Sequence, residues 1–151
     1  MIESAIKILK GEKIIDQADI DIDIGIYGFI PEEIIPQAEL RLSIYKEISS
    51  IKENKNLEQN KKDFIDRFGD VTSEITNLYE LSKLKNIARK LNILSIKYRD
   101  ENFSLKLADD SRLIPPSSKI REIKVNAKDI KSDRLTFIMS KLESFLEKNE
   151  I

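Results

Sequence analysis

The sequence contains no cysteine, no histidine and no tryptophan, and it has only four glycines and four prolines in 151 residues. Without cysteine and histidine the chain cannot form disulfides, thiolate or imidazole metal sites, or a Ser–His or Cys–His nucleophilic centre. Its length is typical of one domain that can bury a sizeable core. Any acid–base chemistry would have to use carboxylates, lysine, tyrosine or hydroxyl groups.

The sequence also lacks a long apolar run and an excess of charge of one sign. No segment approaches the roughly 20 apolar residues of a membrane-spanning helix, and the first ten residues lack the apolar centre of a signal peptide. Lys and Arg number 26 against 27 for Asp and Glu, so the net charge is -1. A nucleic-acid role would therefore need a local patch. We expect a cytoplasmic protein that does not associate with membranes.

Hydrophobic periodicity predicts an early strand followed by helices. Residues 19–26 alternate between isoleucine and mostly aspartate, which is typical of a half-buried strand. Apolar residues at helical spacing predict helices over residues 1–10, 37–52, 57–68 and 73–91. Local signals set the ends of these helices: Gly69 suits a C-terminal position with positive φ, and Thr72 or Ser73 suits an N-cap.

The period changes to two after residue 92. Residues 93–98 and 103–107 predict two strands joined by a hairpin turn at 99–102, and residues 123–125 predict a third. Ser132 or Asp133 then caps a last helix. The predicted class is α+β, with the helices of the first two thirds packed on a small antiparallel sheet, followed by a C-terminal helix. Four leucines of the long helix should face the sheet: Leu78, Leu81, Leu84 and Leu91.

Two groups of charged residues are candidate functional sites. The densest cationic stretch, which would bind a phosphate backbone or form the solvated side of a helix, comprises Lys83, Lys85, Arg89, Lys90, Lys97 and Arg99. Asp63 and Asp66 lie three residues apart, so a helix places them on one face. They could form an acid–base pair or remain solvated with Arg67 pairing locally. The sequence has no phosphate-binding loop, and we expect no catalytic, cofactor or metal-binding residues.

Several short motifs, in this order and spacing, resemble one protein family. The resemblance covers residues 19–98 and is to the C-terminal domain of the bacterial transcription-repair coupling factor. The motifs are Ile30-Pro31-Glu32-Glu33-Ile34-Ile35-Pro36, Arg41-Leu42-Ser43-Ile44-Tyr45-Lys46, Phe64-Ile65-Asp66-Arg67-Phe68-Gly69, Leu81-Ser82-Lys83-Leu84-Lys85 and Ala88-Arg89-Lys90-Leu91. Asn92 stands where the family usually has glycine, and asparagine also tolerates a left-handed conformation.

The resemblance implies a role that residue chemistry alone does not define. The parent protein would be an ATP-dependent DNA translocase that removes stalled RNA polymerase, binds DNA and recruits nucleotide excision repair through the repair protein excinuclease A. This chain would be its non-catalytic regulatory domain over residues 19–151, with residues 1–18 forming a helical linker from the motor. The domain would fold back on an N-terminal excinuclease-B-like module of the same protein, which is an autoinhibitory contact. By the same resemblance, Asp63 and Asp66 would contact that partner.

Two other hypotheses come from the residues themselves. The first is a free-standing nucleic-acid-binding module that uses the cationic stretch from Lys83 to Arg99. The second is an enzyme built on Asp63 and Asp66. Binding to nucleic acid separates the first from a protein-interaction domain, because phosphate contacts give affinities that fall steeply with salt.

Overall fold

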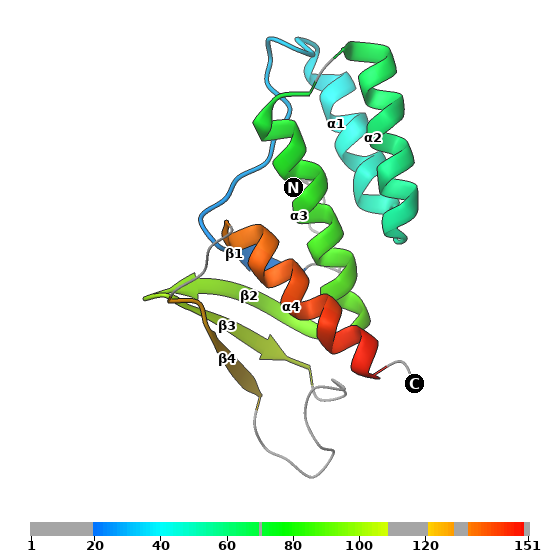
Figure 1. The fold of residues 1–151 in the computed structure, drawn as a ribbon. Coiled ribbons are helices and arrows are strands. Elements are labelled where there is room, and N and C mark those ends of the chain that lie inside the picture. Colours follow the sequence, from blue (N-terminus) through cyan, green and yellow to red (C-terminus); the bar gives the residue numbers. More distant parts are fainter. Residues whose placement is uncertain (1–19, 70, 109–120, 129–132, 150–151) are drawn as a thin grey trace, which may run out of the picture.

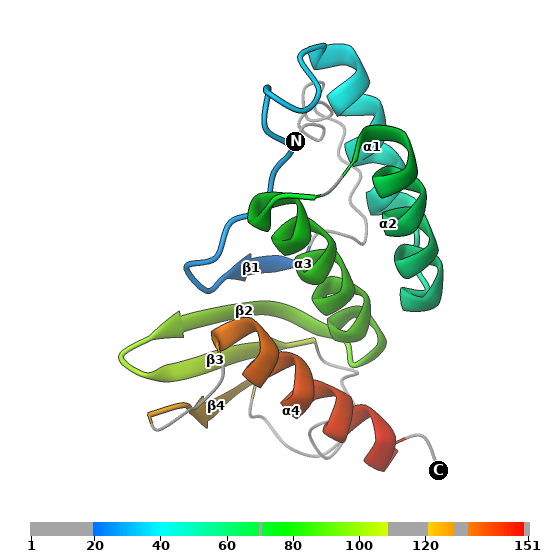
Figure 2. The ribbon, with the colours of Figure 1, turned by 45° about the horizontal axis from the view of Figure 1, so that its top comes forward.

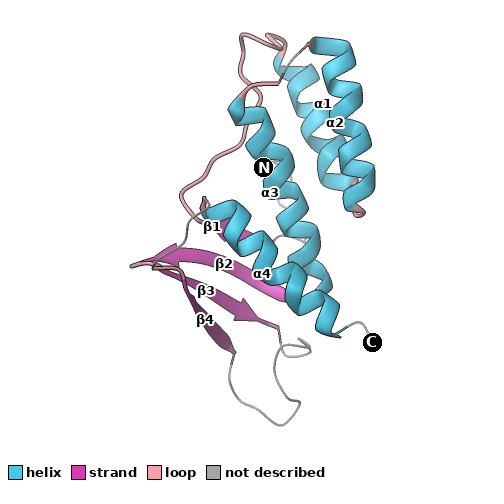
Figure 3. Cartoon of the chain, in the orientation of Figure 1, coloured by secondary structure: helices cyan, strands magenta, loops and turns pink. Residues whose placement is uncertain are grey.

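The structure is a computed structural model that describes residues 20–69, 71–108, 121–128 and 133–149. Figure 1 shows the arrangement of its helices and strands, and Figure 3 distinguishes them by colour. The helices span Ala38–Ser50 (α1), Asn54–Phe68 (α2), Ser73–Lys90 (α3) and Arg134–Asn149 (α4). The strands span Asp21–Asp23 (β1), Ile93–Arg99 (β2), Asn102–Leu107 (β3) and Glu122–Asn126 (β4). The predicted helix over 1–10 and the linker over 1–18 lie outside the described residues.

The four strands form one sheet in the order β1-β2-β3-β4, with α3 and α4 on one face (Figure 2). This confirms the α+β class. The β2–β3 and β3–β4 pairs are antiparallel as predicted, whereas β1 pairs with β2 in parallel. The sheet is therefore mixed, because α1, α2 and α3 separate β1 from β2 and return the chain to the same end of the sheet. Within the described ranges, no helix is both long enough and apolar enough to cross a membrane.

Strand β1 is shorter than the predicted 19–26. Gly25 has a φ of +77°, which ends the extended conformation. The carbonyl of Ile24 accepts a hydrogen bond from Arg134 Nη1 at 3.0 Å, so a side chain of α4 binds this carbonyl just beyond the end of β1. The predicted face is nevertheless correct, because Ile20 and Ile24 are buried against the sheet core and Ile22 and Ile26 pack against it.

Helix α3 passes through two separate hydrophobic cores. Its C-terminal half packs on the sheet and α4, in a core that includes Leu84, Ile87, Ala88, Leu91, Ile96, Phe103, Leu105, Ile138 and Leu142. Its N-terminal half packs on α1 and α2, in a core of Ile30, Ile35, Ile44, Ile48, Leu57, Phe64, Ile75 and Tyr79. The prediction that Leu78 faces the sheet is wrong: Leu78 packs in the second core, whereas Leu81, Leu84 and Leu91 join the first.

The segment between β1 and α1 crosses α3 at close range. A Cβ atom on Gly28 would lie 2.3 Å from the backbone nitrogen of Leu78, so only glycine allows this approach. The Phe29 N–H donates to the Glu74 carbonyl at 3.2 Å, and the Ile30 N–H donates to the Tyr45 hydroxyl at 2.7 Å. These bonds fix the crossing segment to both α3 and α1.

The residues predicted to cap helices or to adopt positive φ do so in the structure. The Thr72 hydroxyl accepts the N–H three residues later at 3.3 Å, and Gly69 has a φ of +93°. Asn92 has a φ of +57°, the left-handed conformation expected after α3. At the hairpin turn, Asp100 and Glu101 both have positive φ, at +52° and +63°. This is the geometry of a primed turn, formed here without glycine.

Candidate partner-binding surface on helix α2

Helix α2 presents Asp63 and Asp66 to solvent. Phe64 is buried between α1, α2 and α3, and Phe68 packs beside it with ring centroids 4.8 Å apart. Because these aromatic rings face the core, both carboxylates project outward, as predicted, and both are exposed. Gln59 Nε2 donates to Asp63 Oδ1 at 3.1 Å. Asp66 makes no hydrogen bond or ion pair with another described residue.

Arg67 does not neutralise either carboxylate. Its guanidinium carbon lies 4.8 Å from the centroid of the Phe68 ring, a cation–π contact that holds the side chain against the helix. Among the described residues, Arg67 forms no ion pair with Asp63 or Asp66. The two carboxylates therefore remain available to a partner.

A shallow groove between α1 and α2 runs beside Asp63. Apolar side chains of both helices form part of its wall, and polar side chains form the rest. The residues that line it are Ile44, Glu47, Asn60, Asp63, Phe64, Arg67 and Phe68. A contact on Asp63 would consequently extend over both helices, and Glu47 adds a second carboxylate from α1.

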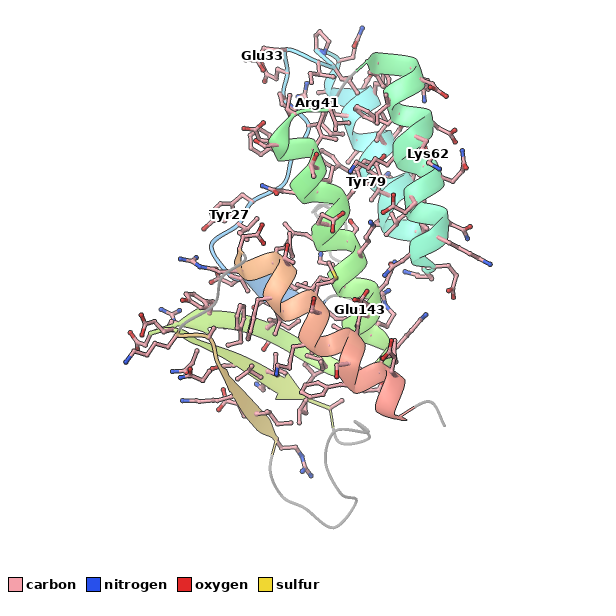
Figure 4. The ribbon with its side chains drawn as sticks, viewed as in Figure 1. Tyr27, Glu33, Arg41, Lys62, Tyr79 and Glu143 are labelled. Carbon is pink, nitrogen blue, oxygen red and sulfur yellow. The ribbon has the colours of Figure 1, made fainter. Side chains whose placement is uncertain are left out.

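Hydrogen bonds fix this surface to α3 from behind. The Tyr79 hydroxyl donates to Asn60 Oδ1 at 2.6 Å, and Asn60 Nδ2 donates to Glu47 Oε2 at 2.8 Å. Tyr79 lies between α3 and the α1–α2 pair (Figure 4). Burial raises the pKa of Tyr79 to about 12, and the nearby carboxylates of Glu47 and Asp63 act in the same direction. The tyrosine thus stays neutral and keeps donating at neutral pH.

Sequence reasoning identified the two aspartates but missed Glu47 and Asn60. Glu47 lies on another helix, 16 positions before Asp63, so no local spacing relates them. One signal was available: Glu47 directly precedes Ile48, a core position of α1, and therefore lies at the border of the buried face. Asn60 has the corresponding border position on α2 and is half-buried.

The cationic stretch from Lys83 to Arg99 does not form one patch. Three of its lysines approach carboxylates on different elements: Lys83 pairs with Glu58 and with Glu80 (3.1 Å), Lys90 with Glu53 (3.6 Å) and Lys97 with Asp21 (3.6 Å). Arg89 Nη1 donates to Asn86 Oδ1 at 2.7 Å. The stretch is therefore divided between the α2–α3 interface and the sheet.

Lys83 is the most enclosed of the three paired lysines. Only 16% of its side chain is exposed, and burial lowers its pKa while the carboxylate of Glu143 raises it. Burial also raises the pKa of its neighbour Glu80. Lys83 and its two carboxylate partners thus tie α2 to α3, and the lysine is not accessible to a phosphate backbone.

Comparison with known proteins places this chain in a family. The model of the TRCF domain matches residues 24–118. The transcription-repair-coupling factor of Rickettsia bellii is 30% identical over 141 residues, which cover 91% of this chain and 13% of that protein. The corresponding protein of Escherichia coli is 27% identical over 120 residues, covering 76% of this chain and 10% of that protein.

A solved structure agrees with these sequence matches. The crystal structure of the C-terminal domain of a transcription-repair coupling factor superposes with a TM-score of 0.70 at 20% identity, covering 87% of this chain and 96% of the other. The fold is therefore that of a C-terminal domain of such a factor, and not of an ATPase module. The chain belongs to the TRCF domain family. It spans about an eighth of the length of the Rickettsia bellii relative.

Proposed function

We propose that this chain is the non-catalytic, autoinhibitory domain of a transcription-repair coupling factor. In this proposal the domain binds an N-terminal excinuclease-B-like module of the same protein and covers the surface that binds excinuclease A. The parent would be an ATP-dependent DNA translocase that acts on stalled RNA polymerase in the cytoplasm. Residues 1–18 would join the domain to the motor.

The observation that supports the proposal most directly is the exposure of Asp63 and Asp66 on one face of a fixed helix. They are exposed on one face of a helix that is packed and hydrogen-bonded from behind, and Arg67 is held away on Phe68. A fixed acidic pair suits arginine side chains, whose planar guanidinium groups bind carboxylates through two parallel hydrogen bonds. Because the helix is already ordered, binding costs little additional conformational entropy.

The proposal predicts the result of reversing both charges. In the full-length protein, Asp63→Lys combined with Asp66→Lys should weaken closure, since truncating one partner of a buried charge pair costs about 2–5 kcal/mol. A domain closed about 99% of the time lowers the apparent affinity for a masked partner about a hundredfold. Affinity for excinuclease A should therefore rise by about ten- to a hundredfold, measured by titration calorimetry.

A matched control separates this contact from the change in net charge. Glu122→Lys combined with Glu147→Lys makes the same charge change at two exposed sites on β4 and α4, and it should leave the affinity unchanged. If the aspartate variant stays within about twofold of wild type while the domain remains folded, these two residues are solvated surface and the proposal fails. An equal rise in both variants would also contradict it.

A further inference from the structure

One face of the sheet is not covered by α3 or α4, which both lie on the other side (Figures 1 and 2). Because side chains alternate along a strand, the register defines the residues of this open face. They form three rows across β2, β3 and β4: Arg99–Asn102–Asn126, Lys97–Ser104–Lys124 and Ser95–Lys106–Glu122. The adjacent β1 adds Asp21 beside Ser95 and Asp23 beside Lys97.

Four cations of the described strands lie on this open face, and three of them have no carboxylate partner among the residues that the structure describes. Lys97 approaches Asp21 at 3.6 Å. Arg99, Lys106 and Lys124 are exposed and form no ion pair with any described residue, although Glu122 stands opposite Lys106 in the register. The carboxylates lie at the border, on β1 and at one end of β4, so the centre of the face is positive.

The arrangement of the cations suits an extended anion. Lys97 and Lys124 stand directly opposite Ser104 on its two sides, and Lys106 lies two residues along from Ser104 on the same strand. With strands about 4.8 Å apart, Lys97 and Lys124 are separated by about 10 Å at the backbone. Several phosphates in a row satisfy this spacing better than one small anion.

The residues between the cations distinguish a nucleic acid from a protein partner. The paired outward positions carry serine and asparagine, which donate hydrogen bonds to phosphate oxygens. They carry no apolar or aromatic side chain, which a stable protein interface uses as its buried centre and a single strand uses for base stacking. Leu94 is 49% exposed but lies in the bulge of β2, outside the paired rows.

We propose that the open sheet face binds the phosphate backbone of double-stranded DNA without reading its sequence. The contact uses Lys97, Lys106 and Lys124 around Ser104, with Arg99 at the hairpin end. It is independent of the proposed masking function, because α2 with its aspartates lies at the opposite end of the molecule from the sheet (Figure 1). Neutralising about three phosphates gives a slope of log affinity against log salt near -2.7.

The test is the fluorescence anisotropy of a labelled 20-base-pair duplex titrated with the intact 151-residue chain. Binding should weaken about 20-fold between 50 and 150 mM NaCl, as that slope requires. Lys97→Gln, Lys106→Gln and Lys124→Gln together should lower affinity at 50 mM NaCl at least tenfold. A double variant of Lys106 and Lys124, which leaves the Asp21 pair intact, should show most of this loss.

The matched control makes the same change at three exposed lysines of α1 and α2: Lys46→Gln, Lys55→Gln and Lys62→Gln. It should alter affinity by less than about threefold, because these lysines belong to α1 and α2 and not to the sheet face that contacts the duplex. The proposal is overturned if the wild-type chain does not bind the duplex at 50 mM NaCl, or if both triple variants lose affinity equally. Tighter binding of a single strand or a poly-glutamate peptide than of the duplex also overturns it.

Discussion

Replacing Leu84 with alanine should lower the free energy of unfolding by about 2–5 kcal/mol. Leu84 is fully buried where α3 meets the sheet and α4, in the core that includes Ile96, Phe103 and Ile138. Truncation removes three carbon atoms from this core and leaves a cavity that the sheet and two helices can fill only in part. Urea unfolding followed by circular dichroism, with linear extrapolation to water, measures the change.

The control is the same substitution at an exposed leucine. Leu94 is 49% exposed, so Leu94→Ala should cost less than about 1 kcal/mol. A loss of under about 1 kcal/mol for Leu84→Ala would contradict the packing of α3 on the sheet described above. A single cooperative transition is expected in both variants, because α3 belongs to both cores and couples their unfolding.

The second large effect is expected at Asn86, a buried polar residue of α3. Its Nδ2 donates to the Ile51 carbonyl at 3.1 Å and to Asn54 Oδ1 at 3.0 Å, and its Oδ1 accepts from Arg89. These bonds tie α3 to the turn between α1 and α2. Asn86→Ala leaves buried polar groups without this partner, so it should cost about 2–3 kcal/mol in chemical unfolding.

Asn77 on the same helix offers the matched comparison. Its Nδ2 makes one exposed hydrogen bond, to the Tyr27 carbonyl at 3.3 Å, so Asn77→Ala should cost only about 0.5–1 kcal/mol. Hydrogen exchange adds a local measurement: Asn86→Ala should reduce the protection of amides around Ile51 more than those of β3. Equal losses of stability in the two variants would show that the Asn86 network does not stabilise the helix junction.

Most of the fold followed from local patterns in the sequence. Apolar spacing located α1, α2, α3 and α4, and alternation located the β2–β3 hairpin and β4. The capping residue Thr72 and the positive-φ residues Gly69 and Asn92 were also correct. These features depend on interactions within a few residues, which a single sequence records directly.

The parts that could not be predicted depend on contacts between distant residues. Leu78 has the same spacing as Leu81 and Leu84, and only the crossing of the Gly28 segment and the α1–α2 pair shows that it belongs to a second core. The parallel pairing and short length of β1 depend on the path of three helices and on Arg134 of α4.

The candidate site likewise has features that the sequence predicted and features that depend on contacts between distant residues. The outward direction of Asp63 and Asp66 followed from the helical period of α2, because Phe64 and Phe68 define its buried side. The contribution of Glu47 and the cation–π contact of Arg67 required the three-dimensional arrangement. The partner role of the aspartates came from family resemblance and stays a prediction.

We propose above all that this domain masks a binding surface of its parent protein. The most direct measurement is the affinity of excinuclease A for the full-length parent and for a parent that lacks residues 19–151. Masking predicts an affinity about a hundredfold higher without the domain, and a return toward the lower value when the isolated domain is added at saturating concentration. An affinity that is unchanged or lower without the domain would contradict it.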